Sequence, residues 1–269
     1  MKKKIYVLPM VLLLAASLTA CRSMDDVQGK SENNTAEVKD DVRVEVKTND
    51  DKDKDKDKKE AILKKYVSAL EGVYNDHVYP DGKDCGFDDN ADLSKNKFAV
   101  YDIDGDGKDE LIIQNTTTSV AGMAEFIYDY NEESDKVVEQ FHEFPQLTYF
   151  DNGVVKAGWS HNQGLAGDFW PYNLYKYDKD KDGYNEIASV DAWQRKFAEK
   201  NGEGKSYPVD VDTNNDGIIF YIMDNGSYDT SNPVSKENYD NWYQSMVNGA
   251  KELSVPYVDL TKENIDNLK

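Results

Sequence analysis

The sequence predicts an α+β fold in which an antiparallel, hairpin-rich β-sheet packs against an N-terminal and a C-terminal helix. Short runs of apolar and aromatic residues recur along the chain and are separated by Asn-Gly and Asp-Gly turn signals, as in β-hairpins. Two other segments, residues 61–74 and 235–253, instead repeat apolar residues every three or four positions, which is typical of helices packed on one face.

The first 21 residues have the pattern of an export signal. Lysines follow Met1, and an apolar run from Ile5 to Ala20 is shorter than the roughly 20 residues that span a bilayer. The sequence Leu18-Thr19-Ala20-Cys21 resembles the lipobox of bacterial lipoproteins. The resemblance implies a signal peptide at 1–20, acylation of Cys21 with a chain such as palmitate, and a lipid-anchored, extracytoplasmic protein at the cell membrane or cell surface. An ordinary secretory signal with an incidental cysteine is the alternative.

Residues 21–59 lack apolar periodicity and end in alternating Asp and Lys. Such a segment buries too little apolar surface to offset the loss of chain entropy on folding. It predicts a disordered, charged tether, followed by a single α+β globular domain at residues 60–269 that is long enough for one substantial core.

The chain is strongly acidic, with a formal net charge of −20. This charge argues against nucleic acid as a partner and against direct adhesion to anionic lipid. With Cys21 acylated, Cys85 has no partner for an intramolecular disulfide. Neighbouring Asp84 opposes a thiolate, so we expect Cys85 to be a structural residue.

The predicted elements follow in order along residues 60–269. The N-terminal helix carries its apolar residues on one face, and so does the C-terminal helix, which begins after Ser235; Thr261 begins a last helical turn. The first face holds Ile62, Tyr66, Val67, Leu70 and Val73, and the second Tyr239, Trp242, Tyr243, Met246 and Ala250. Strands are expected at 98–102, 110–115, 124–130, 136–141, 147–150, 154–159, 171–177, 184–190 and 218–223, with a short helix or irregular crossover at 191–200.

The loop between the first two strands has the spacing of a metal site. Asp102, Asp104 and Asp106 alternate, and Glu110 follows at the ninth position. A calcium ion takes six to eight oxygen ligands, and these carboxylates with the carbonyl of Lys108 supply five donors in register. We therefore predict bound Ca²⁺ as a structural cofactor. An acidic, solvated turn is the alternative.

The motif Asp-x-Asp-Gly-Asp-Gly-x-x-Glu-Leu at residues 102–111 resembles the calcium hairpin of FG-GAP (integrin-type, VCBS-like) repeats. The whole chain is similar to bacterial lipoproteins of unassigned activity that carry one such hairpin. The resemblance implies a metal-binding hairpin in a β-rich setting, and no fixed sequence period indicates a full propeller.

A second loop repeats this spacing more weakly. Its donors would be Asp178, Asp180, Asp182, the carbonyl of Tyr184 and Glu186, but two interleaved lysines reduce the negative field. A solvated hairpin turn is the alternative. A third acidic stretch at 210–217 has Phe220 in place of the ninth-position ligand, so we interpret it as a turn.

A glycine-rich loop at 158–172 holds the best candidates for a ligand pocket: Trp159, His161, Asn162, Asp168 and Trp170. Aromatic faces beside polar groups suit a glycan or a peptide. Alternatively, the two tryptophans belong to the core. A third hypothesis is an exported hydrolase with His161 and Asp168 acting beside Ser160, although neighbouring strand residues point to opposite faces.

Other catalytic motifs are missing from the sequence. The stretch Gly202–Ser206 ends like a phosphate-binding loop but has Glu199 where the first glycine is needed, and no zinc-protease or serine-hydrolase motif occurs. The sequence therefore predicts a lipid-anchored, calcium-binding surface lipoprotein that serves as a binding or interaction module.

Overall fold

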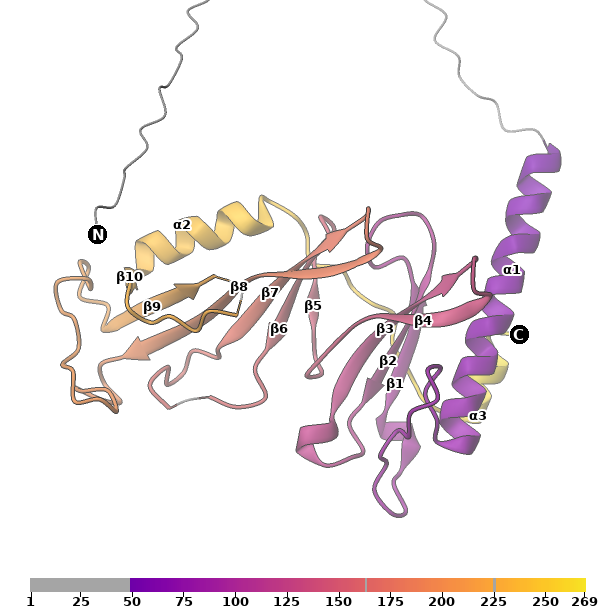
Figure 1. The fold of residues 1–269 in the computed structure, drawn as a ribbon, viewed down its shortest axis with the longest axis horizontal. Coiled ribbons are helices and arrows are strands. Elements are labelled where there is room, and N and C mark those ends of the chain that lie inside the picture. Colours follow the sequence, from indigo (N-terminus) through magenta and orange to yellow (C-terminus); the bar gives the residue numbers. More distant parts are fainter. Residues whose placement is uncertain (1–48, 163, 225) are drawn as a thin grey trace, which may run out of the picture. The chain divides into compact units, whose positions relative to one another are not determined.

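The computed structural model describes residues 49–162, 164–224 and 226–269, and Figure 1 shows their fold. The predicted signal peptide, Cys21 and the predicted tether up to residue 48 lie outside the described residues. The described part is α+β and rich in antiparallel strands, as predicted. It contains two sheets, of five and six strands, whereas the sequence predicts one.

Helix α1 (Asn49–Glu71) begins earlier than predicted and continues into a π-helical turn at Gly72–Asp76. Residues 49–59 were assigned to the disordered tether, and this assignment is wrong because they are helical. Extending a helix from an already packed segment requires no new nucleation. An ion pair of 2.7 Å between Lys58 and Glu132 also holds this part of α1 against the turn after β3.

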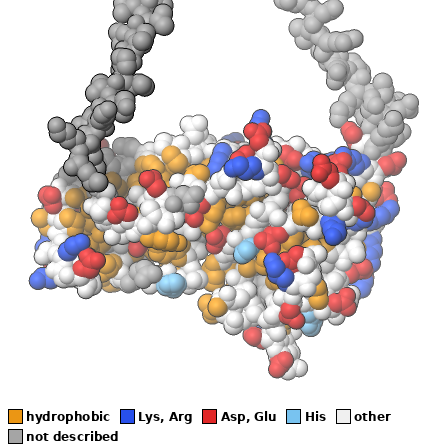
Figure 2. Space-filling view, in the orientation of Figure 1, with side chains coloured by type: hydrophobic (Ala, Val, Ile, Leu, Met, Phe, Trp, Pro, Cys, Tyr) orange, Lys and Arg blue, Asp and Glu red, His pale blue; other side chains and the backbone are white. Residues whose placement is uncertain are grey.

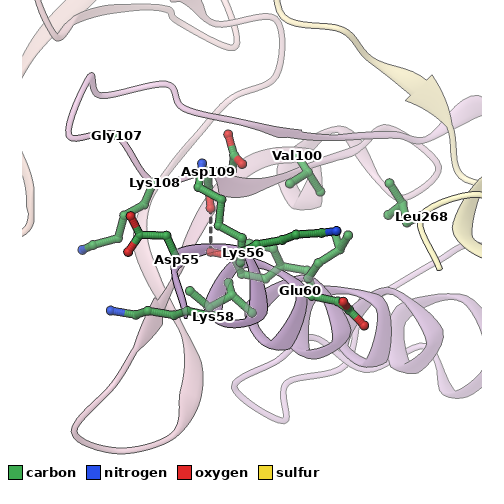
Figure 3. A pocket seen from close by; sticks show the side chains of 13 residues that line it. Asp55, Lys56, Lys58, Glu60, Val100, Gly107, Lys108, Asp109 and Leu268 are labelled. Atoms are coloured by element: carbon green, nitrogen blue, oxygen red, sulfur yellow. Dashed lines mark hydrogen bonds between the residues drawn. The ribbon is translucent and has the colours of Figure 1, made fainter. Parts of the chain in front are cut away.

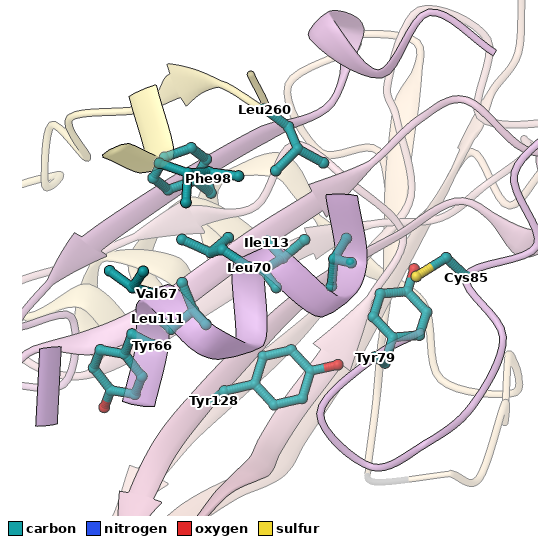
Figure 4. Packing of buried hydrophobic residues seen from close by; sticks show 12 residues of the cluster. Tyr66, Val67, Leu70, Tyr79, Cys85, Phe98, Leu111, Ile113, Tyr128 and Leu260 are labelled. Carbon is teal, nitrogen blue, oxygen red and sulfur yellow. The ribbon is translucent and has the colours of Figure 1, made fainter. Parts of the chain in front are cut away.

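The first sheet has the strand order β11-β1-β2-β3-β4. Its strands are β1 (Lys97–Tyr101), β2 (Glu110–Asn115), β3 (Ala124–Asn131), β4 (Lys136–Glu143) and β11 (Val258–Asp259). Figure 4 shows α1 packed on one face of this sheet, with Leu70 among Phe98, Leu111 and Ile113. The predicted apolar face of α1 is confirmed: Tyr66, Val67, Leu70 and Val73 are buried, and Ile62 is partly buried. Helix α3 (Lys262–Asp266) adds Ile265 to the same cluster.

The second sheet has the strand order β10-β9-β8-β7-β6-β5. Its strands are β5 (Thr148–Tyr149), β6 (Val154–Gly158), β7 (Tyr172–Asp178), β8 (Gly183–Gln194), β9 (Ile218–Met223) and β10 (Val234–Ser235). The helix or crossover expected at 191–200 is wrong for its first residues, because β8 pairs with β9 as far as Gln194. The apolar alternation of Val190 and Ala192 continues that strand, and both residues are buried.

Helix α2 (Lys236–Val247) covers one face of the second sheet, as Figure 1 shows. Ser235 caps its start by accepting a hydrogen bond from the N–H of Asn238. The helix stops before the predicted Leu253, because Asn248 adopts a left-handed conformation, with φ of 45°, and caps the last turn. The predicted aromatic stripe is partly buried against the sheet core, which confirms it as packing; it comprises Tyr239, Trp242, Tyr243, Met246 and Ala250.

The two sheets share a core within one compact unit. Ile112, Ile127 and Phe141 of the first sheet pack with Val155 and Tyr175 of the second. The first sheet is therefore buried on both faces, by α1 on one side and by the second sheet on the other. This explains why β2 contains the continuous apolar run Leu111-Ile112-Ile113 and does not alternate apolar with polar residues.

Lys and Arg side chains are interleaved with Asp and Glu over the face seen in Figure 2. Cys85 is buried and unpaired, as expected for a structural residue. Burial, followed by the nearby charge of Asp84, raises the pKa of the Cys85 thiol to about 12. No described helix is both long enough and apolar enough to span a bilayer.

Candidate metal site and ligand pocket

The acidic loop joins β1 to β2 in two sharp turns. Gly105 and Gly107 have φ values of +82° and +91°, a region that side chains disfavour. The N–H groups of both glycines donate to the carboxylate of Asp102, at 2.8 and 3.1 Å. The loop backbone thus fixes the first predicted ligand by local hydrogen bonds.

The loop brings together three of the predicted ligands. Asp102, Asp104 and Asp106 each offer a carboxylate oxygen within 4.8 Å of the others. The Oδ2 atom of Asp104 is buried and has no hydrogen-bond partner. Burial, with a further contribution from the charges of Asp106 and Asp102, raises the pKa of Asp104 to about 6. A cation among these oxygens would remove their mutual repulsion.

Glu110 lies deeper than the three aspartates and is only 1 % exposed. Its Oε2 accepts a hydrogen bond of 2.8 Å from the N–H of Ile103, which ties the two ends of the loop together. Burial, and then the charges of Asp104 and Asp129, raise the pKa of Glu110 to about 9. The carboxylate of Glu110 is not part of the group of three. The side chain of Lys108 pairs with Asp106 at 3.2 Å, and the role of its carbonyl stays a prediction.

The donors of the second loop diverge. Asp178 pairs with Lys181 at 3.2 Å, and Glu186 accepts a hydrogen bond from the Gly226 N–H and lies 3.0 Å from the Ser189 hydroxyl oxygen. Asp182 instead accepts from the Tyr177 hydroxyl at 2.9 Å. Over the ranges that the structure describes, no group of three close metal-ligating side chains includes Asp178, Asp180, Asp182 or Glu186. The geometry therefore favours the hairpin-turn alternative for this loop, with Tyr184 packed at its base.

The third acidic stretch is a turn, as expected. Asp212 is buried and accepts hydrogen bonds of 2.9 Å from the N–H groups of both Asp216 and Gly217. These bonds hold the turn that leads into β9.

The first acidic loop lies near the turn end of the β7–β8 hairpin. The Tyr177 hydroxyl of β7 donates to Asp182, and the charge of Asp104 also acts on this hydroxyl. The glycine between β5 and β6, Gly153, lies next to both Tyr177 and Asp104: a Cβ atom there would be 3.3 Å from Tyr177 and 3.8 Å from the Asp104 carbonyl. The candidate metal site is thus at the junction of the two sheets.

A pocket of about 490 Å³ opens on the second sheet. Its described lining residues are Trp159, Ser160, His161, Asn173, Asp191, Met223, Tyr228 and Thr230. Of the five residues predicted to form a ligand pocket, the structure brings only Trp159 and His161 to it.

The other three have different roles. Asn162 donates to the carbonyls of Gly167 and Phe169, at 3.2 Å each, and so shapes the loop. Asp168 forms an ion pair with Lys196. Trp170 is 53 % exposed, which contradicts its assignment to the core, while Trp159 is partly buried in a core cluster. Because residue 158 is a glycine, the Trp170 ring can lie close to the backbone there. The indole N–H of Trp170 donates to the Trp159 carbonyl at 2.7 Å.

The hydrolase hypothesis gains no support from this geometry. The Ser160 hydroxyl lies 3.1 Å from Nδ1 of His161, so the two are closer than strand alternation predicted. Asp168, however, is absent from the described lining and its carboxylate is paired with Lys196. A base oriented by Asp168 therefore has no basis in the arrangement.

Sequence reasoning missed the pocket residues Asn173, Asp191, Met223 and Tyr228. A signal was present in the second half of β8, where the polar residues Ser189 and Asp191 alternate with the apolar residues Ala188, Val190 and Ala192. Polar side chains on one face of a central strand indicate that this face lines a site.

A cavity of about 840 Å³ lies between α1 and the acidic loop (Figure 3). Its walls are Lys56, Lys58 and Glu60 of α1, Lys108, and apolar residues such as Leu268. The Tyr66 hydroxyl donates to the Asp109 carbonyl across it, at 2.9 Å. Exposed charged side chains of both signs line this cavity, an arrangement that selects no particular ligand.

No protein-family model, curated protein or solved structure matches this chain.

Proposed function

We propose that this chain is a lipid-anchored, extracytoplasmic surface lipoprotein that binds Ca²⁺ in the Asp102–Glu110 loop and serves as a binding module. One observation carries the calcium part. Three carboxylates approach within 4.8 Å, and one of them buries an oxygen without a partner. The anchor rests on the lipobox-like Leu18–Cys21 segment.

Calcium suits this loop better than magnesium. The Asp102, Asp104 and Asp106 carboxylates sit on a short, tightly turned loop, and water can complete a coordination shell of six to eight oxygens. Magnesium needs a nearly ideal octahedron and gives up its water reluctantly. We expect apparent affinity in the weak range of extracellular modules, about 10⁻⁴ to 10⁻³ M.

Bound calcium would act on stability through the junction of the sheets. It would neutralise the carboxylates that repel each other in the loop, including Asp104, whose charge also acts on Tyr177 of the second sheet. The metal would thereby stabilise both the β1–β2 hairpin and its contact with the β7–β8 hairpin. The glycan or peptide ligand expected from the sequence would then meet a rigid surface.

The test is a thermal melt of the chain from residue 22 onward in EGTA, and then with Ca²⁺ or Mg²⁺ at ten times the expected dissociation constant. Linkage predicts about 1.4 kcal/mol of added stability, or a rise of about 3–6 °C in Tm, with calcium. Magnesium should give a smaller rise. Identical melting in EGTA and in calcium would reduce the loop to an acidic turn.

A further inference from the structure

We propose that the pocket between Trp159 and Asp191 binds an organic cation, namely a protonated amine carried on a small apolar group. This inference deepens the binding role proposed above and rests on it, but it does not depend on calcium. The pocket volume of about 490 Å³ lies in the range of small-molecule sites.

The pocket occupies the face of the second sheet that α2 leaves uncovered. In β8, Val190 and Ala192 pack in clusters that include α2 residues. The intervening Asp191 and the neighbouring Trp193 belong to the opposite face, because side chains alternate along a strand. Trp193, Tyr221 and Met223 form the apolar cluster on that face, with Trp159 packed against it.

Asp191 is the only charged carboxylate among the described lining residues. Its Oδ1 accepts a hydrogen bond of 2.7 Å from the N–H of Ala192, and no described Lys or Arg lines the pocket or forms an ion pair with it. Burial raises the pKa of Asp191. A half-buried carboxylate that is not paired with any described Lys or Arg is stabilised by a cation that enters from solvent.

Two aromatic side chains, Trp159 and Tyr228, line the same pocket as this carboxylate. The Trp159 N–H donates to Oδ1 of Asn173 at 2.7 Å, and Asn173 also accepts from the Ser189 hydroxyl at 2.8 Å. These bonds hold the indole in place. Tyr228 is 62 % exposed and meets Trp159 edge to face, with ring centroids 6.1 Å apart. Aromatic faces near a carboxylate attract ammonium groups and shelter the apolar part of the ligand.

Other ligand classes fit less well. An anion would be repelled by Asp191. A neutral sugar would find Asn173 already engaged, because its Oδ1 accepts two bonds and its amide nitrogen donates to the Tyr175 hydroxyl. The side chain of a peptide lysine presents the same chemistry as a free amine, so the test must separate these two sources.

The experiment is calorimetric titration of the chain from residue 22 onward, with measurements in both EGTA and calcium. The probes are phenethylamine, the neutral 2-phenylethanol, the anionic phenylacetate, methyl glucoside, and N-acetyl-lysine amide. We expect phenethylamine to bind at least about tenfold more tightly than 2-phenylethanol, a difference of about 1.4 kcal/mol. N-acetyl-lysine amide binding as well as phenethylamine would assign the site to peptide lysines. Equal affinity for all the aromatic probes, or binding of the glucoside alone, would overturn the proposal.

The variant Asp191→Asn keeps the shape of the side chain and removes its charge. It should weaken phenethylamine binding about tenfold and leave 2-phenylethanol unchanged. The matched control is Asp168→Asn, which removes an exposed carboxylate outside the pocket. Tyr228→Ala, at an exposed position, should weaken the amine several-fold without altering Tm. Equal amine affinity in wild type and Asp191→Asn would also overturn the proposal.

The outcomes separate this proposal from the calcium site. A calcium-dependent rise in Tm without amine binding would defeat only the cation pocket. Amine binding in EGTA, with no calcium-dependent rise, would defeat only the metal loop and leave the binding role in place.

Discussion

The carboxylate of Glu125 accepts a hydrogen bond of 2.8 Å from the hydroxyl of Tyr149, and this bond joins β3 of the first sheet to β5 of the second. Glu125 is fully buried. It also accepts from the Tyr257 hydroxyl, from the amide of Gln114 at 2.8 Å and from the N–H of Gln146 at 2.9 Å. One buried carboxylate thus gathers donors from both sheets and from the C-terminal segment.

Replacing Glu125 with Gln should lower the free energy of unfolding by about 1–3 kcal/mol. The NH₂ of the new amide cannot accept hydrogen bonds, so some of the donors around residue 125 lose their acceptor. Urea denaturation measures the loss. Glu133→Gln, in the exposed turn after β3, is the control and should change stability by less than about 0.5 kcal/mol. Equal stability of the two variants would show that the Glu125 network is dispensable.

Asp104→Asn should abolish the rise in Tm with calcium. In EGTA its Tm should be unchanged or slightly higher, since the substitution removes a buried charge whose Oδ2 has no partner. Asp180→Asn, at the corresponding position of the second loop, should keep the full calcium response. The measurement is a melt of each variant with and without calcium. A similar loss for Asp104→Asn in both conditions would contradict the structural-metal role.

The stability of the metal-free protein should fall as pH rises. In the folded state the pKa of Asp104 is about 6 and that of Glu110 about 9, both above their usual values of 3.8 and 4.5. The contribution of these protonated carboxyls is therefore complete below about pH 4 and is lost as pH rises through about 6 and then about 9.

Urea denaturation in EGTA at pH 5, 7 and 9 measures this decline. Calcium must displace the same protons, so its affinity should increase from pH 5 to pH 7 and the decline in stability should be smaller in saturating calcium. The double variant Asp104→Asn/Glu110→Gln removes both titrating groups and should flatten the dependence in EGTA. An unchanged slope in that variant would assign the pH effect to other groups.

Leu70→Ala should lower the free energy of unfolding by about 2–5 kcal/mol, because it leaves a cavity between α1 and the first sheet. Leu70 is fully buried there (Figure 4). Lys64→Ala, on the exposed side of the same helix, removes only an ion pair of 2.9 Å with Glu60 and should cost less than about 0.5 kcal/mol. Denaturation with urea compares the two. Similar losses would mean that α1 is held by its surface charges.

Cys21→Ser should release the protein from the membrane fraction and prevent incorporation of a palmitate analogue. The control is Cys85→Ala, which removes the other cysteine of the chain and should leave labelling and fractionation unchanged. Fractionation after metabolic labelling measures both. Membrane association of Cys21→Ser equal to that of wild type would contradict the lipid anchor.

Local sequence patterns predicted the hairpins well. Asn152-Gly153 and the acidic loop both fall between paired strands, because turn residues act within a few positions of the chain. The same patterns failed where tertiary packing determines the secondary structure. Residues 49–59 look too charged to fold, but they extend a helix whose next turns are buried. Asp191 is expected from the sequence to begin a short helix or irregular crossover, but it lies inside β8.

By itself, the sequence determined the strand and helix periodicity and the clustering of Asp102, Asp104 and Asp106. These depend on residues within ten positions of one another, so backbone geometry suffices. Only the tertiary structure decided that there are two sheets, that Asp104 lies near Tyr177, and that Trp159, Asp191 and Tyr228 share a pocket. Those residues are brought together by the pairing register of distant strands, which depends on the total burial of the sheets and not on any local signal.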